Sequence, residues 1–163
     1  MAGLILPIQR DEFGLPLTLD DQPDLEAIPD FYQRGAGQFW VAVAGGRVVG
    51  TIALLDIGDR EGALRKMFVH PDWRGRRVGT AQRLLDTLLA HAGAQALRRV
   101  YLGTTSSFLA AHRFYEKNGF CRVEAEDLPV SFPRMAVDMR FYVVDPTAGG
   151  PSADVIRPTA GWG

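Results

Sequence analysis

The chain has 163 residues, of which 47% are hydrophobic and 23% are charged. This balance is typical of a compact domain that builds its own core and is unlike that of a disordered or collagen-like chain. The 18 Lys and Arg against 19 Asp and Glu leave a formal net charge of -1, but residues 1–59 sum to -6, residues 60–122 to +8 and residues 123–163 to -3. The lone Cys121 excludes a disulfide or a cysteine zinc site within one chain and favours a reducing compartment.

Nothing in the sequence predicts a membrane-spanning segment or a signal peptide. No run approaches the roughly 20 apolar residues that span a bilayer, and the apolar start lacks the basic leader of a signal peptide. We therefore expect a cytoplasmic protein with a single domain at residues 1–144. Residues 145–163 are rich in Pro and Gly, which predicts a flexible tail. The alternative is a tail that docks on a neighbouring subunit of a homodimer.

Short β-type runs dominate the first half. Gly45-Gly46 predicts a tight turn between the runs at 39–44 and 47–56, and Pro71 ends the run at 64–69. Residues 20–34 look helical but contain Pro23 and Pro29, which predicts two short helices. The predicted strands are residues 3–9, 39–44, 47–56 and 64–69.

The second half predicts two helices and three further strands. Apolar residues recur at spacings of three and four from near Arg77 until Gly93, which predicts a long amphipathic helix. A second helix runs from a Ser106-Ser107 cap to Asn118 and ends at Gly119. The remaining predicted strands are residues 99–102, 120–124 and 135–144, so the order of elements is that of an α/β fold around a mixed sheet.

The segment between the fourth strand and the long helix predicts an anion site. The first turn of a helix offers backbone N–H groups without intrahelical partners, together with the positive end of the helix dipole. Gly75 and Gly79 let an anion approach the backbone, while Arg74, Arg76 and Arg77 add charge. The spacing matches neither the Walker nor the dinucleotide-binding glycine pattern.

Two blocks resemble the GCN5-related N-acetyltransferase (GNAT) family. Arg74 to Gly79 is similar to the family's R/Q-x-x-G-x-G/A signature, and Ala111 to Phe120 is similar to its A-x-x-L/F-Y-x-x-x-G-F segment. The order of elements agrees over residues 3–144. The resemblance implies a mixed, mostly antiparallel twisted sheet of about seven strands flanked by about four helices.

The resemblance also implies an activity. An acetyl-CoA-dependent N-acetyltransferase would move an acetyl group directly to a primary amine of a small molecule or peptide in a ternary complex. Acetyl-CoA is then the co-substrate, and we expect no metal, because the chain shows no cluster at metal-ligand spacing. The implied coenzyme-binding residues are Met67, Phe68 and Val69 along the pantetheine, and Arg74, Gly75, Arg76, Arg77, Val78, Gly79 and Thr80 around the pyrophosphate.

Two side chains carry the implied chemistry. Tyr115 would stand near the thioester sulfur and protonate the departing thiolate, with a half-buried helix tyrosine as the alternative. Glu61, the carboxylate nearest the fourth strand, is the candidate general base, with a turn residue as the alternative. The chain departs from the family pattern at Arg77, where the first glycine is expected, and at Phe108, where many relatives have asparagine.

The family resemblance places the acceptor site near Phe31, Tyr32 and the loop 128–133. Acidic side chains in the flanking segments suggest a cationic amine, and a solvated acidic face is the alternative. A coenzyme-binding sensor without catalysis is a second hypothesis. A nucleic-acid-binding module that uses the +8 segment is a third, disfavoured because no recognised binding motif is present. We therefore expect neither nucleic acid nor membrane as a partner.

Overall fold

The computed structural model describes residues 2–8, 24, 27–75, 77–105, 109–135 and 138–147. Within these residues, six strands form one sheet in the order β1-β2-β3-β4-β6-β5, in which β3 and β4 are parallel and the other neighbours are antiparallel. The strands are β1 (Gln38–Ala44), β2 (Arg47–Gly58), β3 (Glu61–Val69), β4 (Arg99–Thr104), β5 (Cys121–Val123) and β6 (Arg140–Val144). The helices are α1 (Ala2–Pro7), α3 (Ile28–Phe31), α4 (Thr80–Ala94) and α5 (Leu109–Lys117). The expected mixed, mostly antiparallel sheet is confirmed, with six strands described instead of about seven.

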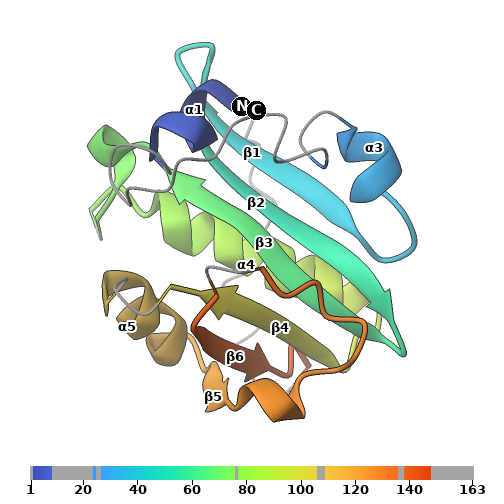
Figure 1. Cartoon of the computed structure of the whole chain (residues 1–163). Helices are drawn as coiled ribbons and strands as arrows, with labels where there is room; N and C mark the ends of the chain where they lie inside the picture. Colours follow the sequence, from blue (N-terminus) through green and yellow to red (C-terminus); the bar gives the residue numbers. More distant parts are fainter. Residues whose placement is uncertain are drawn as a thin grey trace.

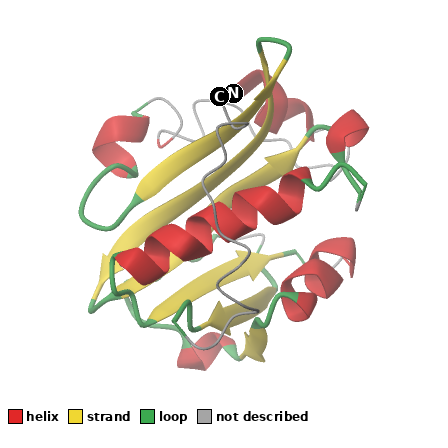
Figure 2. Cartoon of the chain, turned by 180° about the vertical axis from the view of Figure 1, so that it is seen from behind, coloured by secondary structure: helices red, strands yellow, loops and turns green. Residues whose placement is uncertain are grey.

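Helices cover both faces of the sheet. α4 crosses one face over β1, β2 and β3, as Figure 2 shows from behind, and buries Leu84, Leu85 and Leu88 in the larger core cluster. α1 packs on β2 and β3 from the other face (Figure 1). A smaller cluster that includes Phe132 and Phe141 lies apart from the α4 cluster. The sheet therefore separates two apolar layers.

The structure corrects the first predicted strand. Residues 3–9 were expected to be a strand, but Ala2–Pro7 form α1. Leu4, Ile5 and Ile8 are buried, while Gly3 between Ala2 and Leu4 is exposed. A spacing of three and four places the buried side chains on one helical face, and a short continuous apolar run does not distinguish helix from strand. Packing on β2 and β3 selects the helix, which removes one strand from the expected sheet.

The β1–β2 hairpin is confirmed. Gly45 and Gly46 both have positive φ, at 55° and 77°, as a two-residue turn of the primed type requires. The next connection is less regular, because β3 carries an extra residue against β2 near Lys66, whose φ is 56°. Such a bulge turns neighbouring side chains toward the same region. It lies beside the place where β3 and β4 separate.

Both long helices are confirmed, with shifted ends. α4 begins at Thr80, three residues after the predicted start, because Gly79 adopts φ 71° and breaks the helical path. The helix also continues past Gly93 to Ala94. α5 ends at Lys117, ahead of Gly119 at φ 88°. The predicted cap at 106–107 lies outside the described residues.

Two other predicted elements are shorter than expected. Within residues 20–34, α3 confirms one short helix, and most of the segment before it lies outside the described residues. The strand predicted at 135–144 is reduced to Arg140–Val144. The N–H of Met135 is bonded to the side chain of Asp138 at 2.9 Å, so that segment turns instead of extending the sheet. The predicted tail lies outside the described residues from position 148 onward.

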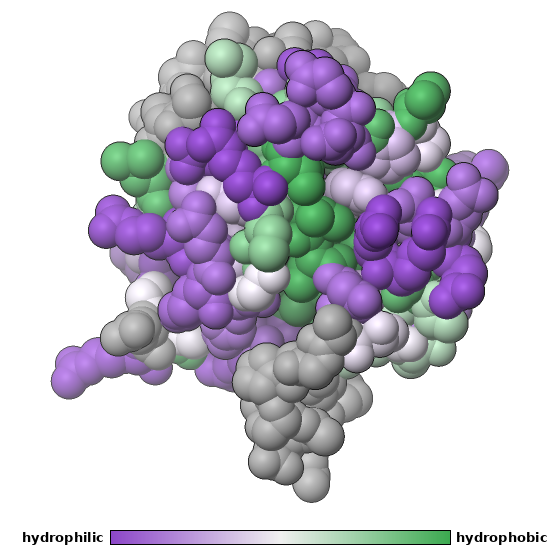
Figure 3. Space-filling model, turned by 90° about the horizontal axis from the view of Figure 1, so that it is seen from below, coloured by the Kyte–Doolittle hydropathy of each residue, from purple (hydrophilic) through white to green (hydrophobic). Residues whose placement is uncertain are grey.

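The described surface mixes hydrophilic and hydrophobic areas. On the face in Figure 3, hydrophobic surface gathers in a central strip between hydrophilic areas. None of the helices in the described ranges has the length and apolar character needed to cross a membrane.

Candidate functional site

Strands β3 and β4 pair over only a short stretch. β3 continues to Val69 against β2, while β4 continues to Thr104 against β6. The strands therefore diverge, and no described strand pairs with this edge of β3 after Ala63. Backbone N–H and C=O groups along such an edge can bind an extended ligand as a further strand would. The parallel pairs are Glu61–Arg99, Gly62–Val100 and Ala63–Tyr101.

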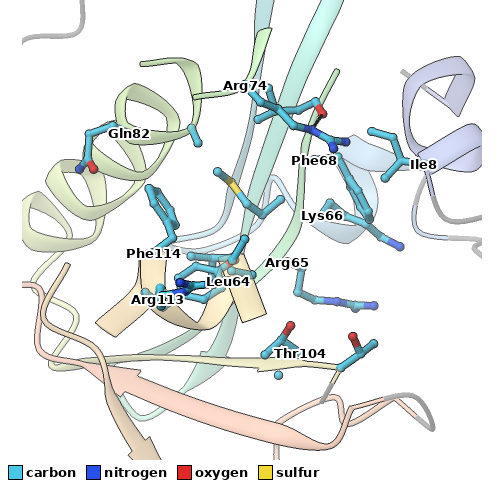
Figure 4. A pocket seen from close by; sticks show the side chains of 18 of the residues that line it. Ile8, Leu64, Arg65, Lys66, Phe68, Arg74, Gln82, Thr104, Arg113 and Phe114 are labelled. Atoms are coloured by element: carbon cyan, nitrogen blue, oxygen red, sulfur yellow. Dashed lines mark hydrogen bonds between the residues drawn. The ribbon is translucent and has the colours of Figure 1, made fainter. Parts of the chain in front are cut away.

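A cavity of about 860 Å³ lies at this divergence (Figure 4). Its lining combines Tyr115, which belongs to the core cluster with α4, and Phe132, which belongs to the other cluster. The lining therefore draws on both apolar clusters, and we name its two groups of residues by the elements that supply them: the helix-side end from the start of α4 and from α5, and the loop-side end from the residue that follows α1, from Arg65 and Lys66 of β3 and from the loops before β6. The helix-side end comprises Arg74, Gly75, Gly79, Gln82, Arg113, Phe114, Tyr115 and Lys117. The loop-side end comprises Ile8, Arg65, Lys66, Phe132, Pro133, Met135 and Asp138.

The helix-side end is built around the start of α4. Arg74 is anchored by its Nε, which donates to the carbonyl oxygen of Val69 at 2.8 Å, as the dashed line in Figure 4 shows. Gly75 has φ 98° and open space where a Cβ would stand, so backbone conformation is what favours glycine there. The Gly79 N–H bonds the Gly75 carbonyl at 3.0 Å and closes the loop. A helix start, two glycines and an arginine together make an anion-binding end.

The structure brings most of the predicted loop to the cavity, but not all of it. Of the described loop residues, three lie outside the cavity lining: Arg77, Val78 and Thr80. Arg77 is exposed to solvent, and Thr80 is buried. The Val78 carbonyl instead accepts a hydrogen bond from Arg83 at 2.8 Å. Arg76 and Phe108 lie outside the described residues. The predicted residues that line the cavity are Met67, Phe68, Val69, Arg74, Gly75, Gly79 and Tyr115.

Tyr115 faces the cavity from α5. Its side chain is only 6% exposed and packs edge-on against Phe114 and Phe120. Burial raises the pKa of its hydroxyl above the ordinary value. The hydroxyl makes no hydrogen bond to another residue in the described ranges. Tyr115 is therefore a neutral phenol whose donor is open to a bound molecule.

The loop-side end carries two cations from adjacent positions of β3. Arg65 lies against the ring of Phe31, with 5.8 Å between the guanidinium carbon and the ring centroid. Lys66 is buried, and its Nζ lies 3.5 Å from a carboxylate oxygen of Asp24, which also accepts a hydrogen bond from the Tyr32 hydroxyl. Burial lowers the pKa of Lys66, while Asp24 opposes that shift. The expected acceptor residues Phe31 and Tyr32 are not among the lining residues; Phe31 contacts Arg65, and Tyr32 shares Asp24 with Lys66.

Asp138 adds a carboxylate to this end. Its Oδ2 accepts the N–H of Met135 at 2.9 Å. A Cβ on Gly103 of β4 would lie 2.7 Å from that carboxylate, so the side chain rests directly on the backbone of β4. Burial raises the pKa of Asp138, and the nearby charges of Arg65 and Arg134 partly oppose the shift.

The structure does not bring Glu61, the predicted general base, to the cavity. Glu61 opens β3, three residues before Leu64, the first residue of that strand in the lining. Its carboxylate accepts a hydrogen bond from the Tyr101 hydroxyl at 3.2 Å and lies 3.8 Å from Arg98. These contacts hold the paired ends of β3 and β4 together. Glu61 directly follows the turn at residues 59–60, a position close to the turn-residue alternative.

The described lining of the cavity carries more positive than negative side chains. Among the described lining residues, one carboxylate, Asp138, stands among five cations. A net positive lining favours anionic groups on a bound molecule. No group of three or more His, Cys, Asp or Glu in the described ranges is arranged to hold a metal ion. The five cations are Arg65, Lys66, Arg74, Arg113 and Lys117.

Sequence reasoning missed Arg65, Lys66 and Asp138. A signal for the first two was present, because two consecutive charged residues interrupt an otherwise apolar strand run, Leu64 to Val69. Charged residues rarely occupy central strands without a partner or a ligand. Asp138 gave no such signal, since it follows a loop and sits beside no recognisable motif. Only the fold places it against Gly103.

Comparisons with known proteins point to one family. A family model described as "Acetyltransferase (GNAT) family" matches residues 5–120. An acetyltransferase of the GNAT family from Staphylococcus aureus Mu50 has a solved structure that is 39% identical, with a TM-score of 0.83 over 88% of this chain and 89% of that one. A second solved structure is that of N-acetylglutamate synthase from Neisseria gonorrhoeae, complexed with coenzyme A and N-acetyl-glutamate. It is 18% identical, with a TM-score of 0.66 over 88% of this chain and 31% of that one, which shows a shared fold.

Among curated proteins, N-acetylaspartate synthetase from Danio rerio is 40% identical over 128 residues, which is 76% of this chain. Those residues are 44% of the relative. The chain thus spans less than half the length of this relative.

Proposed function

The chain belongs to the acetyltransferase (GNAT) family, and from that premise we propose that it transfers the acetyl group of acetyl-CoA to the primary amine of a small acceptor. The observation that carries the proposal is the cavity at the divergence of β3 and β4, which joins an anion-binding helix start to the charged loop-side end. Coenzyme and acceptor would enter from different ends. Their reacting groups would meet beside Tyr115.

The coenzyme fits the helix-side end by its chemistry. Acetyl-CoA combines a pyrophosphate with a pantetheine arm that contains two amides. The pyrophosphate would bind the start of α4 with Arg74, Gly75 and Gly79, and Arg76 and Arg77 would add charge nearby. The pantetheine amides would pair with the open edge of β3 at Met67 to Val69, as an added strand does.

Tyr115 would act on the leaving group. When an amine attacks the thioester, the carbon–sulfur bond breaks and a thiolate departs. A phenol whose pKa is raised by burial is fully protonated at neutral pH and can donate that proton. The open hydroxyl and its position in the lining support this role.

We further propose that the acceptor carries a carboxylate, as an amino acid does. Arg65 and Lys66 at the loop-side end would bind it, the first by charge-assisted hydrogen bonds and the second by charge. A curated relative whose name is N-acetylaspartate synthetase supports an amino-acid acceptor. A free amino acid also suits a cavity of about 860 Å³ that must hold part of the coenzyme as well.

A thiol-release assay tests the proposal. With acetyl-CoA present, we expect turnover with L-aspartate or L-glutamate to exceed turnover with L-lysine or spermidine by about tenfold or more in kcat/KM. Initial-velocity plots should intersect, as they do when both substrates bind before transfer. Parallel lines would instead indicate a covalent acetyl-enzyme. Coenzyme binding without thiol release for any amine would favour a sensor.

A further inference from the structure

Asp138 is the single carboxylate among the described residues that line the cavity. It belongs to the loop-side end, and Tyr115 of α5 lines the same cavity. The amine of an acceptor is an ammonium ion near neutral pH and must lose a proton before it can attack. A carboxylate in this position is therefore the natural group to meet that cation.

The protein holds this carboxylate in place from two sides. Oδ2 accepts the N–H of Met135, and the N–H of Asp138 in turn bonds the carbonyl of Met135 at 3.0 Å. Gly103 lets the carboxylate rest against β4, since a Cβ there would lie 2.7 Å from Cγ and Oδ2. The other oxygen, Oδ1, makes no hydrogen bond to a residue in the described ranges. One oxygen is thus anchored and the other is available to a ligand.

The charges around Asp138 suit a proton acceptor. Arg65 faces it from β3 and Arg134 from its own loop, and both favour the ionised form. Burial acts in the opposite direction and is the larger influence, so the pKa lies above that of an exposed aspartate. A carboxylate whose pKa is raised is a stronger base than an exposed aspartate and takes a proton more readily. Tyr115 is the proton donor in the same cavity.

We propose that Asp138 binds the ammonium group of the acceptor and accepts the proton that frees its nitrogen for attack. The inference rests on the proposed acetyl transfer and extends it to a second catalytic residue. Arg65 would bind the acceptor carboxylate while Asp138 holds the ammonium. The pair therefore recognises both charges of an amino-acid zwitterion.

The proton balance closes over one turnover. The ammonium passes one proton to the Asp138 carboxylate, and the nitrogen lone pair forms the new carbon–nitrogen bond. The carbon–sulfur bond then breaks, and the thiolate takes the Tyr115 proton. Tyr115 regains a proton from the nitrogen of the new amide, and Asp138 releases its proton to water after the product leaves. The net products are the acetylated amine, free coenzyme A and one proton.

The first experiment compares the wild-type chain with Asp138→Asn over a range of pH. In the wild type, kcat/KM for L-aspartate should rise with pH along an acid limb as the base ionises. Asp138→Asn should lower kcat/KM by about 10²-fold or more and remove that limb, while the Kd of coenzyme A measured by calorimetry stays unchanged. Asp127→Asn changes an exposed aspartate of the preceding loop and is the matched control.

A second variant moves the carboxylate without removing it. Gly103 does not have a positive φ, so Gly103→Ala acts through the clash of the new Cβ with Asp138, whose Cγ and Oδ2 would lie at 2.7 Å and whose Cβ would lie at 3.1 Å. The Asp138 side chain must therefore shift. We expect kcat/KM to fall by about tenfold, with coenzyme binding kept. This variant tests the proposal even if Asp138→Asn folds poorly.

Three results would overturn the inference. An acid limb retained in Asp138→Asn, whether or not KM rises, would remove the proton-accepting role. Loss of the limb in Glu61→Gln instead would assign the proton to the other carboxylate. Variants that match an active wild type overturn the role of Asp138 alone, whereas a wild-type chain that acetylates no amine overturns the proposed function as well.

Discussion

The two ends of the cavity are built in different ways. The helix-side end takes its residues from two continuous stretches of chain, the loop from Arg74 to Gly79 that leads into α4 and the segment from Arg113 to Lys117 on α5. The loop-side end gathers Ile8, Arg65 and Asp138, which are far apart in the sequence. A continuous stretch leaves a motif with fixed spacing, whereas single residues from distant segments leave none. The contrast suggests a shared coenzyme end and an acceptor end particular to this chain.

Changing Tyr115 of the helix-side end should have the largest effect. Tyr115→Phe keeps the ring packing and removes only the donor, so kcat should fall by about 10²-fold. The KM values for acetyl-CoA and acceptor should change little, because the residues proposed to bind the pyrophosphate and the acceptor carboxylate are unchanged. Steady-state kinetics with both substrates varied measures this. A kcat within twofold of the wild type would remove Tyr115 from the mechanism.

Changing the loop-side end should affect the acceptor alone. Arg65→Met keeps much of the side-chain length but loses charged hydrogen bonds worth about 1.5–3 kcal/mol, so the acceptor KM should rise by about 10- to 150-fold. The Kd of coenzyme A should stay unchanged. Arg47→Met at the exposed β1–β2 turn is the control. If Arg65→Met weakened coenzyme binding as much as acceptor binding, the two ends of the cavity would not act independently.

Changing the helix-side end should affect the coenzyme alone. Gly75→Ala places a side chain at φ 98°, a conformation that costs about 1–3 kcal/mol, so the loop should shift and the Kd of coenzyme A should rise by about tenfold. Gly58→Ala is a matched control, because its φ is 88° and its Cβ position is also open. It should lower stability similarly and leave coenzyme binding intact. Calorimetry and urea unfolding of both variants measure these changes.

The smallest expected effect is on the stability of the folded state at alkaline pH. The folded pKa of Tyr115 lies above its unfolded value of 10.0, so the folded state keeps its proton while the unfolded state loses it. Stability from this group is complete below the unfolded pKa and declines as pH rises toward the folded pKa. At about pH 11 the loss is about 1.4 kcal/mol for one such tyrosine. In urea unfolding, Tyr115→Phe should show a shallower alkaline decline than the wild type.

Sequence reasoning predicted the local features well. The β1–β2 hairpin, the two long helices and the glycine loop each depend on residues within one turn or a few turns of one another. Positive φ at Gly46 and Gly79 follows from turn and cap chemistry that the sequence displays directly. The shifted helix start and the shortened β6 are errors at the ends of elements, where a single side chain such as Asp138 decides the boundary.

Two features depend on more than local sequence. Residues 3–8 are apolar throughout, and only packing on β2 and β3 selects helix over strand. Glu61 begins the strand whose later residues line the cavity, and its carboxylate lies at the paired end of that strand beside Tyr101. The course of a chain segment in the fold decides both features, and no local pattern shows it.

The sequence by itself determined the family, the glycine loop from Arg74 to Gly79 and the position of Tyr115 on its helix, because each depends on local spacing. Its basic middle segment also pointed to an anionic ligand. Only the tertiary structure assembled the loop-side end. Arg65 and Asp138 are 73 positions apart, and they meet because β3 and β4 diverge and glycine at position 103 lets a carboxylate rest on the sheet.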